Sequence, residues 1–234
     1  MARFPRRIFR WQDYIESILI AILLALIVRT FVLTGYRVPT TTMAPNLLPG
    51  DFIFSFRLPY GVRLPLTEKK WAVQAPKRGE IVVFTFPDQP RTNYVKRVIG
   101  LPGDLIEIRK GRLRVNGQEL NYQQITAVPE EVQQVAGEFE LWLETSDEGP
   151  RQILRQKKLS DRNFGPISVP QDEVFLLGDN RDASDDSRYW GTVPVSRVEG
   201  RVFLIWLSLG WREPTGSFQW PAVRWDRTWM RIGD

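Results

Sequence analysis

Most of this chain of 234 residues is divided into short runs of branched and aromatic residues by breaks that contain glycine or proline. Such runs, separated by turn residues, are typical of consecutive strands in an antiparallel sheet. The runs are Phe52–Phe56, Ile81–Phe86, Tyr94–Ile99, Leu105–Ile108, Leu113–Val115, Val174–Leu177 and Val202–Leu207. Helical periodicity is weak, and we expect only one or two helical turns, at Glu130–Gly137. The sequence therefore predicts a mainly β protein with an antiparallel β-sheet domain.

One apolar segment precedes these runs. Its uninterrupted part, Ile18–Val28, has eleven residues, too few to cross about 30 Å of hydrocarbon at about 1.5 Å per residue. The wider range 15–33 is long enough if Glu16 and Arg29 lie near the two interfaces, where a charged head stays in water. We therefore expect a transmembrane anchor at 15–33. A cleaved signal peptide is the alternative, but the following TGYRVP offers no small-x-small cleavage site.

Positive charge is concentrated before the apolar segment. The chain has a formal net charge of +5, and four arginines stand among its first ten residues. Basic residues that flank a membrane segment stay on the cytoplasmic side. This predicts a single pass with a cytoplasmic N-terminus and the rest of the chain on the outer or lumenal side. No nucleic-acid partner is expected, because the body of the chain has no basic stripe with interleaved aromatic residues.

The chain contains no cysteine and no histidine. Disulfides, thiolate metal sites and cysteine nucleophiles are therefore excluded, as are imidazole metal sites and every Ser-His-Asp arrangement. If the chain catalyses acyl transfer with a hydroxyl nucleophile, its base must be Lys, Asp, Glu, Tyr or an amine. No metal or cofactor is implied.

One lysine stands in a strand-like run, NYVKRVIG, where charged residues neighbour valines. Lysine has a pKa of about 10.4 in water and becomes neutral at working pH only when burial destabilises its charged form. Strand geometry sends Lys96 and Arg97 to opposite faces, so one of them is expected to point inward. The residues alone do not say which one does, and an edge strand with both ends in water is the alternative.

Three blocks carry a resemblance to a known family. They are GYRVPTTTMAPNLLPGD at Gly35–Asp51, YVKRVIGLPGD at Tyr94–Asp104 and GDNRDASDDSRYWGTVP at Gly178–Pro194. In that order they resemble type I signal peptidase, the membrane-bound serine endopeptidase that removes signal peptides from secreted preproteins. The resemblance covers about residues 15–207. It implies a bacterial-type plasma or thylakoid membrane, signal peptides of exported preproteins as substrates, contact with membrane lipid and no cofactor.

The resemblance also implies roles for residues in the first two blocks. The family's nucleophile is the second Ser of an S-x-S-M-x-P motif, and Thr42 stands at that position in TTTMAP. The lysine before Arg-Val-Ile-Gly is the family's general base, which corresponds to Lys96. The oxyanion hole is formed by the backbone N–H at the nucleophile and a hydroxyl two residues earlier, here Thr42 and Thr40.

The third block matches the family pattern G-D-N-R-x-N-S-x-D-S-R. By that match Ser184 holds the lysine amine in position, and Asp186 and Arg188 stabilise the site. Gly178–Asn180 form the approach to it. Substrate-binding residues do not follow from the residues, nor does the oligomeric state.

Three positions depart from the family pattern: Thr42 replaces Ser, Ala183 replaces Asn and Asn46 stands where Thr is usual. Threonine nucleophiles with an amine base exist, but the added methyl stiffens χ1 and demands space. The leading hypothesis is a signal peptidase that uses a hydroxyl/Lys dyad. The alternative is a non-catalytic paralogue that binds signal peptides or a membrane partner without cleavage.

The predicted organisation is a basic cytoplasmic N-terminus at 1–14, the anchor at 15–33 and the β domain at 34–210. Residues 118–165 are polar and poorly periodic, and we expect a solvated excursion of the sheet, at the position of a small cap in the family. The segment 211–234 contains four tryptophans and four arginines. It is expected either to contact a membrane interface or to pack its aromatic rings on the β domain.

Overall fold

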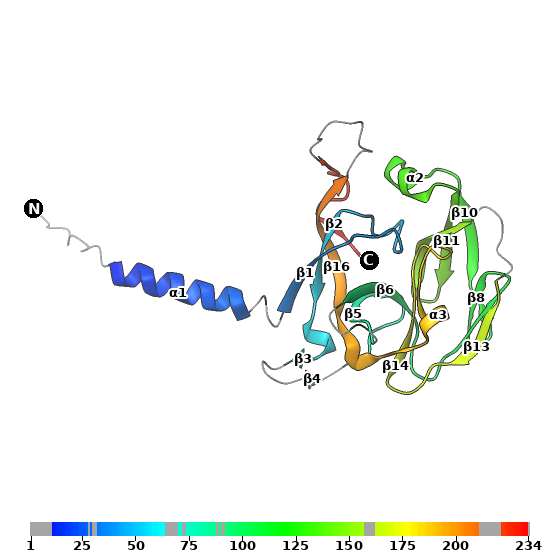
Figure 1. Cartoon of the computed structure of the whole chain (residues 1–234), viewed down its shortest axis with the longest axis horizontal. Coiled ribbons are helices and arrows are strands. Elements are labelled where there is room, and N and C mark those ends of the chain that lie inside the picture. The colour runs from blue at the N-terminus through cyan, green and yellow to red at the C-terminus, as the bar shows by residue number, and fades with distance from the viewer. Residues whose placement is uncertain are drawn as a thin grey trace, which may run out of the picture.

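The computed structural model of the chain describes residues 11–27, 29, 32–63, 70–71, 74–87, 89, 92–156, 162–210 and 221–233. Figure 1 shows one long helix, α1, at one end of the molecule and a body of β-sheets at the other. Helix α1 comprises Trp11–Ile27, and the first strand, β1, comprises Leu33–Arg37. The protein is thus mainly β beyond its N-terminal helix.

One large antiparallel sheet forms the centre of the body. Its order is β1-β2-β16-β5-β6-β14-β15, and the short strands β17 and β18 pair with β16. Beyond β1, the bounds are β2 Asp51–Phe56, β5 Ile81–Thr85, β6 Asn93–Gly100, β14 Glu173–Leu177, β15 Val193–Pro194, β16 Val198–Gly210, β17 Ala222–Val223 and β18 Met230–Arg231. Because β16 pairs with both β2 and β5, strands far apart in the sequence lie side by side.

Two smaller antiparallel sheets and a hairpin complete the β structure. One sheet has the order β13-β7-β8-β9, with β13 Phe164–Ser168, β7 Leu105–Arg109, β8 Arg112–Val115 and β9 Gln118–Glu119. The other has the order β10-β11-β12, with β10 Asn121–Ile125, β11 Phe139–Ser146 and β12 Gly149–Gln156. The hairpin pairs β3 Val62–Arg63 with β4 Lys70–Trp71. The short helices are α2 Glu130–Ala136, α3 Ser187–Trp190, and the 3-10 helices η2 Leu58–Tyr60 and η3 Val195–Arg197.

The mainly β, antiparallel fold predicted from the branched runs is confirmed. The seven runs coincide with β2, β5, β6, β7, β8, β14 and β16, and the predicted helical turns coincide with α2. Strand β2 alternates buried and partly buried residues, whereas all five residues of β5 are buried. Strand β5 lies between β16 and β6, and its continuous apolar run is what a strand covered on both faces requires.

The N-terminal helix differs from the predicted anchor at 15–33. Helix α1 ends at Ile27 and Leu33 already belongs to β1, while residues 28, 30 and 31 and the basic residues 1–10 lie outside the described residues. The 17 residues of α1 correspond to about 25 Å, against about 30 Å of hydrocarbon. Within the described ranges, no helix is both long and apolar enough to cross a membrane. The predicted transmembrane helix and single pass are therefore not supported.

The described part of 118–165 forms regular strands rather than the expected solvated excursion. The sheet β10-β11-β12 carries a fully buried carboxylate, that of Glu144. Arg151 Nε and Arg181 Nη2 each donate a hydrogen bond to Glu144 Oε1 at 2.6 Å. Charged residues are buried here as a paired group, so a stretch whose polarity indicates a loop can still form a sheet.

Two hydrophobic clusters hold the loop between β1 and β2 from opposite sides. Met43 and Leu47 are buried against side chains of β2, β5 and β16. Ala44 and Leu48 are buried against α2, β11 and β12. The loop is thus wedged between the large sheet and the three-stranded sheet, which restricts the backbone that carries TTTMAP.

The C-terminal segment is attached to the start of β2. Asp51 is fully buried; Arg227 Nη2 lies 2.7 Å from its Oδ2, and Arg224 Nη2 lies 3.2 Å from its Oδ1. Trp225 and Trp229 are exposed, and the other two tryptophans of the segment lie outside the described residues. The arginines therefore bind the segment to the β domain, while the described tryptophans stay on the surface.

Candidate active site

The stretch that carries the candidate nucleophile lies in the loop between β1 and β2. At the base of this loop, Val38 N donates to Asp51 O at 2.8 Å and Gly50 N donates to Val38 O at 2.9 Å. Together with the buried side chains on either side, these bonds restrict where the loop backbone can lie. The hydroxyls of Thr40 and Thr42 are 3.2 Å apart in this loop and form a hydrogen bond.

A cavity of about 540 Å³ opens beside the loop. Four of the residues singled out in the sequence, Thr40, Thr42, Lys96 and Ser184, all line it. They come from the loop after β1, from β6 and from the loop after β14. The other lining residues are Tyr36, Arg37, Val38, Pro39, Met43, Val83, Thr92, Asn93, Tyr94, Val95, Asp182, Ala183, Asp185 and Tyr189.

Lys96 is buried on the central strand β6. It is paired with Val82 of β5 in the sheet, and only 2% of the residue is exposed. Burial lowers the pKa of the Lys96 amine to about 8, while the negative charges of Asp186, Asp185 and Asp179 oppose that shift. Burial has the larger effect, so a substantial fraction of the amine is neutral slightly above neutral pH.

Ser184 lies deep in the cavity. Its hydroxyl oxygen is buried and has no hydrogen-bond partner among the described residues. A Cβ at Gly178 would lie 2.2 Å from Ser184 Oγ and 2.6 Å from Thr42 O. Glycine is therefore required at 178, because a larger residue would collide with the Ser184 hydroxyl and with the backbone of Thr42.

Asp186 and Arg188 form an ion pair close to Ser184 in the sequence. Asp186 is fully buried; its Oδ1 accepts a hydrogen bond from Arg188 Nε at 2.7 Å, and its Oδ2 accepts one from Gly178 N at 3.0 Å. Arg188 Nη2 also donates to the backbone carbonyls of Arg181 and Ser184. The Asp186–Arg188 pair therefore connects Gly178 and Arg181, which precede Ser184, to the residues that follow it.

Arg97 is also buried, although only one of Lys96 and Arg97 was expected to point inward. Its Nε and Nη2 donate to the two carboxylate oxygens of Asp179, each at 2.7 Å, and Asp179 is itself fully buried. Asn46 Nδ2 donates to Asp179 Oδ2 at 2.8 Å, which links the Arg97–Asp179 ion pair to the loop between β1 and β2. Both faces of β6 are covered, so strand geometry alone does not separate an inward from an outward residue here.

Comparison with known proteins decides the family. A family model described as signal peptidase, peptidase S26, matches residues 11–207. The chain belongs to this family of signal peptidases. The resemblance stated from the three sequence blocks is therefore confirmed.

Curated relatives of the signal peptidase family agree with this assignment. Signal peptidase I of Pseudomonas fluorescens is 35% identical over 218 residues, covering 86% of this chain and 74% of the relative. Signal peptidase I of Pseudomonas aeruginosa is 34% identical and covers 88% and 75%. Probable signal peptidase I-2 of a Synechocystis species is 31% identical and covers 83% and 72%.

In this member of the signal peptidase family, the sequence did not reveal which tyrosines line the cavity. Tyr94 lies two residues before Lys96 on β6, so the two share a face of the strand, and this spacing was the one available signal. Tyr36 and Tyr189 come from distant segments and carry no such signal. In the described parts of the chain, no group of three or more acidic residues is arranged to hold a metal ion.

Proposed function

We propose that this protein is an endopeptidase that removes signal peptides from exported preproteins, with Thr42 as nucleophile and Lys96 as general base. The observation that carries the proposal is a buried lysine, with a pKa lowered to about 8, that lines one cavity with the Thr42 hydroxyl. A hydroxyl nucleophile needs a nearby base that is neutral at working pH. The membership in the signal peptidase family supports the same reaction.

The proposed reaction proceeds in two steps. Thr42 Oγ1 attacks the scissile carbonyl carbon as its proton passes to the neutral Lys96 amine, and the protonated amine then gives a proton to the leaving nitrogen. The product of this step is an ester between Thr42 and the signal peptide. Lys96 next takes a proton from a water molecule that attacks this ester, and the Thr42 hydroxyl is regenerated.

The developing negative charge on the carbonyl oxygen needs two donors. In the proposal these are the backbone N–H of Thr42 and the hydroxyl of Thr40. The distance of 3.2 Å between the two threonine hydroxyls supports a place for Thr40 close to the nucleophile. When substrate is bound, the Thr40 hydroxyl is proposed to donate its proton to the carbonyl oxygen.

Ser184 is assigned to orienting the lysine amine. The buried hydroxyl without a partner among the described residues is available to accept a hydrogen bond from Lys96. Asp186 and Arg188 act through Ser184 by holding its segment, and they touch no reacting atom. They are therefore positioning residues in this proposal.

The substrate is expected to lie extended through the cavity, beside the segment Tyr36–Thr40 and the strand residues Asn93–Val95. An extended peptide placed along a strand gains main-chain hydrogen bonds from it. The apolar part of the lining, with Val38, Met43 and Val83, suits small side chains next to the cleaved bond. By the resemblance to type I signal peptidases, small residues are expected at the first and third positions before that bond.

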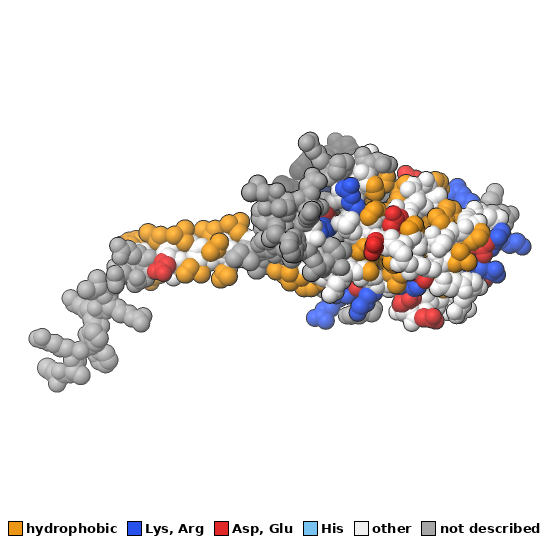
Figure 2. All heavy atoms as spheres, turned by 90° about the horizontal axis from the view of Figure 1, so that it is seen from below, with side chains coloured by type: hydrophobic (Ala, Val, Ile, Leu, Met, Phe, Trp, Pro, Cys, Tyr) orange, Lys and Arg blue, Asp and Glu red, His pale blue; other side chains and the backbone are white. Residues whose placement is uncertain are grey.

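Helix α1 is proposed to associate with a membrane. Its leucine and isoleucine side chains are largely exposed, and Figure 2 shows hydrophobic side chains along the helix. Exposed apolar area of this kind is stabilised in the interfacial or acyl region of a bilayer. Flotation of the full chain with lipid vesicles tests this, with Leu19→Lys and Leu23→Lys introduced together as the comparison. Equal flotation of both proteins contradicts a role of α1.

Cleavage of a model preprotein by the purified full chain tests the proposed reaction, with Lys96→Ala as the inactive control. If the methyl of Thr42 is the main defect of the site, Thr42→Ser raises kcat/KM by about 10- to 100-fold, since misplacing a reacting group by about 1 Å costs up to about 10²-fold. Thr42→Ala abolishes cleavage. If a folded Thr42→Ser is as inactive as Thr42→Ala, the alternative function, binding of signal peptides or a membrane partner without cleavage, is favoured.

A further inference from the structure

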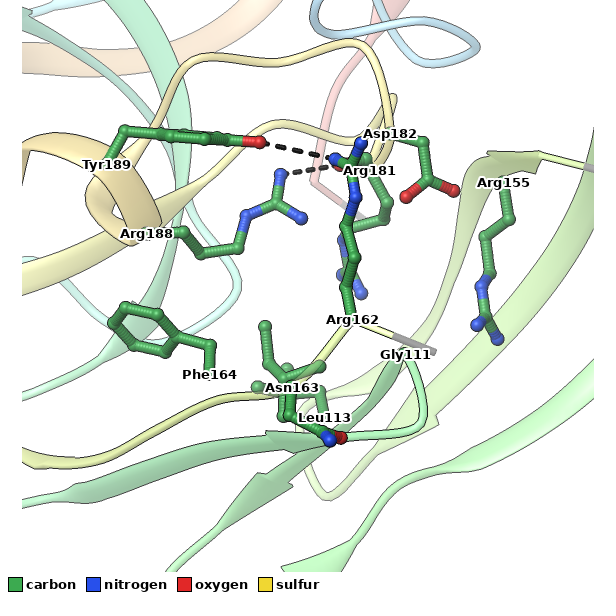
Figure 3. A pocket seen from close by; sticks show the side chains of 11 residues that line it. Gly111, Leu113, Arg155, Arg162, Asn163, Phe164, Arg181, Asp182, Arg188 and Tyr189 are labelled. Atoms are coloured by element: carbon green, nitrogen blue, oxygen red, sulfur yellow. Dashed lines mark hydrogen bonds between the residues drawn. The ribbon is translucent and has the colours of Figure 1, made fainter. Parts of the chain in front are cut away.

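A second cavity, of about 440 Å³, lies next to the candidate active site. Its charged lining consists of four arginines and one carboxylate: Arg155, Arg162, Arg181, Arg188 and Asp182. Figure 3 shows Arg162, Arg188 and Tyr189 converging near Arg181. Such an excess of guanidinium groups around one cavity is a setting in which anions are bound.

Two of the four arginines have carboxylate partners and two have none among the described residues. Arg188 is paired with Asp186, and Arg181 with Glu144. The guanidinium of Arg155 instead lies over aromatic rings, 5.5 Å from that of Tyr122 and 5.9 Å from that of Trp142. Arg162 Nη1 donates to the hydroxyl of Tyr189 at 3.2 Å. The positive charges of Arg155, which is 5% exposed, and of the exposed Arg162 are therefore not neutralised by a described carboxylate.

A buried donor in the lining points the same way. Arg181 is 7% exposed, and its Nε has no hydrogen-bond partner among the described residues. A buried donor left unsatisfied is unfavourable, so such groups normally face an acceptor. Because Arg181 lines the cavity, an anionic oxygen bound there is the proposed partner of this donor.

The cavity adjoins the proposed substrate path. Asp182 and Tyr189 line both cavities, so a polypeptide that leaves the first past Tyr189 enters the second. Figure 1 places α3 and β13, which flank the second cavity, in the half of the body that is farther from helix α1. A lipid headgroup is therefore disfavoured if α1 is the membrane-associated element, and a segment of the substrate is favoured.

We propose that this cavity binds an acidic side chain, Asp or Glu, of the polypeptide substrate, outside the subsites next to the scissile bond. Arg155 and Arg162 receive the carboxylate, and Ile108, Leu113 and Phe164 accommodate the apolar part of the bound segment. This inference rests on the proposed function for the identity of the substrate. It adds a charge preference that the small-residue subsites do not provide.

Peptide binding to the non-cleaving Lys96→Ala protein tests the inference separately from catalysis. A peptide that spans a signal-peptide cleavage site is compared in pairs that differ only by Glu or Gln, with the Glu moved through each flanking position. At one position the Glu peptide is expected to bind about tenfold more tightly, the effect of one charge-assisted contact of about 1.4 kcal/mol. Arg162→Gln reduces that ratio to near one.

Arg109→Gln is the matched control, because Arg109 is an exposed arginine on β7 that is paired with Glu107 and lies outside the cavity lining. It leaves the Glu preference unchanged. Absence of a Glu preference at every position overturns the inference, as does a preference that survives both Arg155→Gln and Arg162→Gln. Arg162-dependent binding of inorganic phosphate or of phosphatidylglycerol vesicles, without discrimination between the peptides, shows a small-anion or lipid site instead. If the Lys96→Ala protein binds Glu peptides selectively but the native chain does not cleave a preprotein, only the proposed function is contradicted.

Discussion

Two buried charges beside the segment 178–188 are accommodated in opposite ways. The carboxylate of Glu144 accepts hydrogen bonds from Arg151, Arg181 and Tyr122, and its pKa is held well below the usual range by the charges of Arg181 and Arg151 against the effect of burial. No ion pair among the described residues includes Lys96, and burial lowers its pKa to about 8.

The surroundings of Glu144 and Lys96 suit the two residues for different roles. A buried charge with complete partners stays charged at all working pH values and fixes the packing of the elements around it. A buried amine without an ion-pair partner is easily deprotonated, which is unfavourable for stability but necessary for a base. The Glu144 cluster joins the three-stranded sheet to the loop after β14, whereas Lys96 lines the cavity and is the proposed base.

The largest expected effect comes from giving Lys96 a charge that does not titrate. Lys96→Arg is expected to abolish cleavage, at the upper end of the roughly 10²- to 10⁴-fold contribution of general bases, because a guanidinium does not deprotonate in proteins. Initial rates on a model preprotein measure this. Lys77→Arg, at an exposed site outside the cavity, is the control. Undiminished cleavage by Lys96→Arg means that another group is the base.

Removing the charge of Glu144 is expected to have the largest effect on stability. Glu144→Gln leaves Arg151 and Arg181 buried without their counter-charge, and breaking a buried pair from one side costs about 3–5 kcal/mol. Urea unfolding at pH 7 measures the loss, with exposed Glu138→Gln as the control.

The pH dependence sharpens that result. Because the pKa of Glu144 is lowered in the folded state from its ordinary value of 4.5, its contribution is fully present above about pH 4.5 and is lost as the pH falls below it. The difference between the two proteins is therefore expected to shrink in acid. A change below about 1 kcal/mol at pH 7 contradicts the role of the cluster.

Removing the charge of Lys96 is expected to increase the stability of the folded protein, in contrast to Glu144→Gln. Burial lowers the pKa of Lys96 from its ordinary value of 10.5 to about 8 on folding, which corresponds to about 3 kcal/mol against the protonated form. Lys96→Met is therefore expected to be more stable than the native chain by about this amount at pH 7. Between pH 8 and 10.5 the folded protein loses the proton first, so the native chain gains stability and the advantage of Lys96→Met disappears. An advantage independent of pH shows that packing rather than charge is its cause.

The smallest expected effect concerns Asp185, an exposed carboxylate that raises the pKa of Lys96. Cleavage is expected to increase about tenfold per pH unit below about pH 8 and to level off above it, because only the neutral amine acts. Asp185→Asn moves the midpoint of that profile to lower pH by less than about 0.7 units, since exposed charge pairs contribute about 0.2–1 kcal/mol. Asp147→Asn, far along the chain and exposed, leaves the midpoint in place. A shift upward contradicts the assigned sign.

Several features of this protein follow from local sequence. The branched runs between turn residues predicted the strands because strand formation depends on a pattern only a few residues long. The absence of histidine and cysteine left lysine among the few possible bases. The three blocks led to the family, and the model match over residues 11–207 confirmed it. The apolar segment was misjudged, because hydrophobic composition does not say where a helix ends and β1 begins.

The state of each buried charge was decided only by the tertiary structure. Lys96 and Arg97 are neighbours with the same charge sign, yet one has a lowered pKa and the other forms a two-bond ion pair with Asp179. Glu144 lies in a stretch that reads as a polar loop and becomes fully buried. A pKa and the strength of an ion pair depend on the groups within a few ångströms in space. In this protein those groups come from β6, the loop after β14 and the three-stranded sheet, which folding alone brings together.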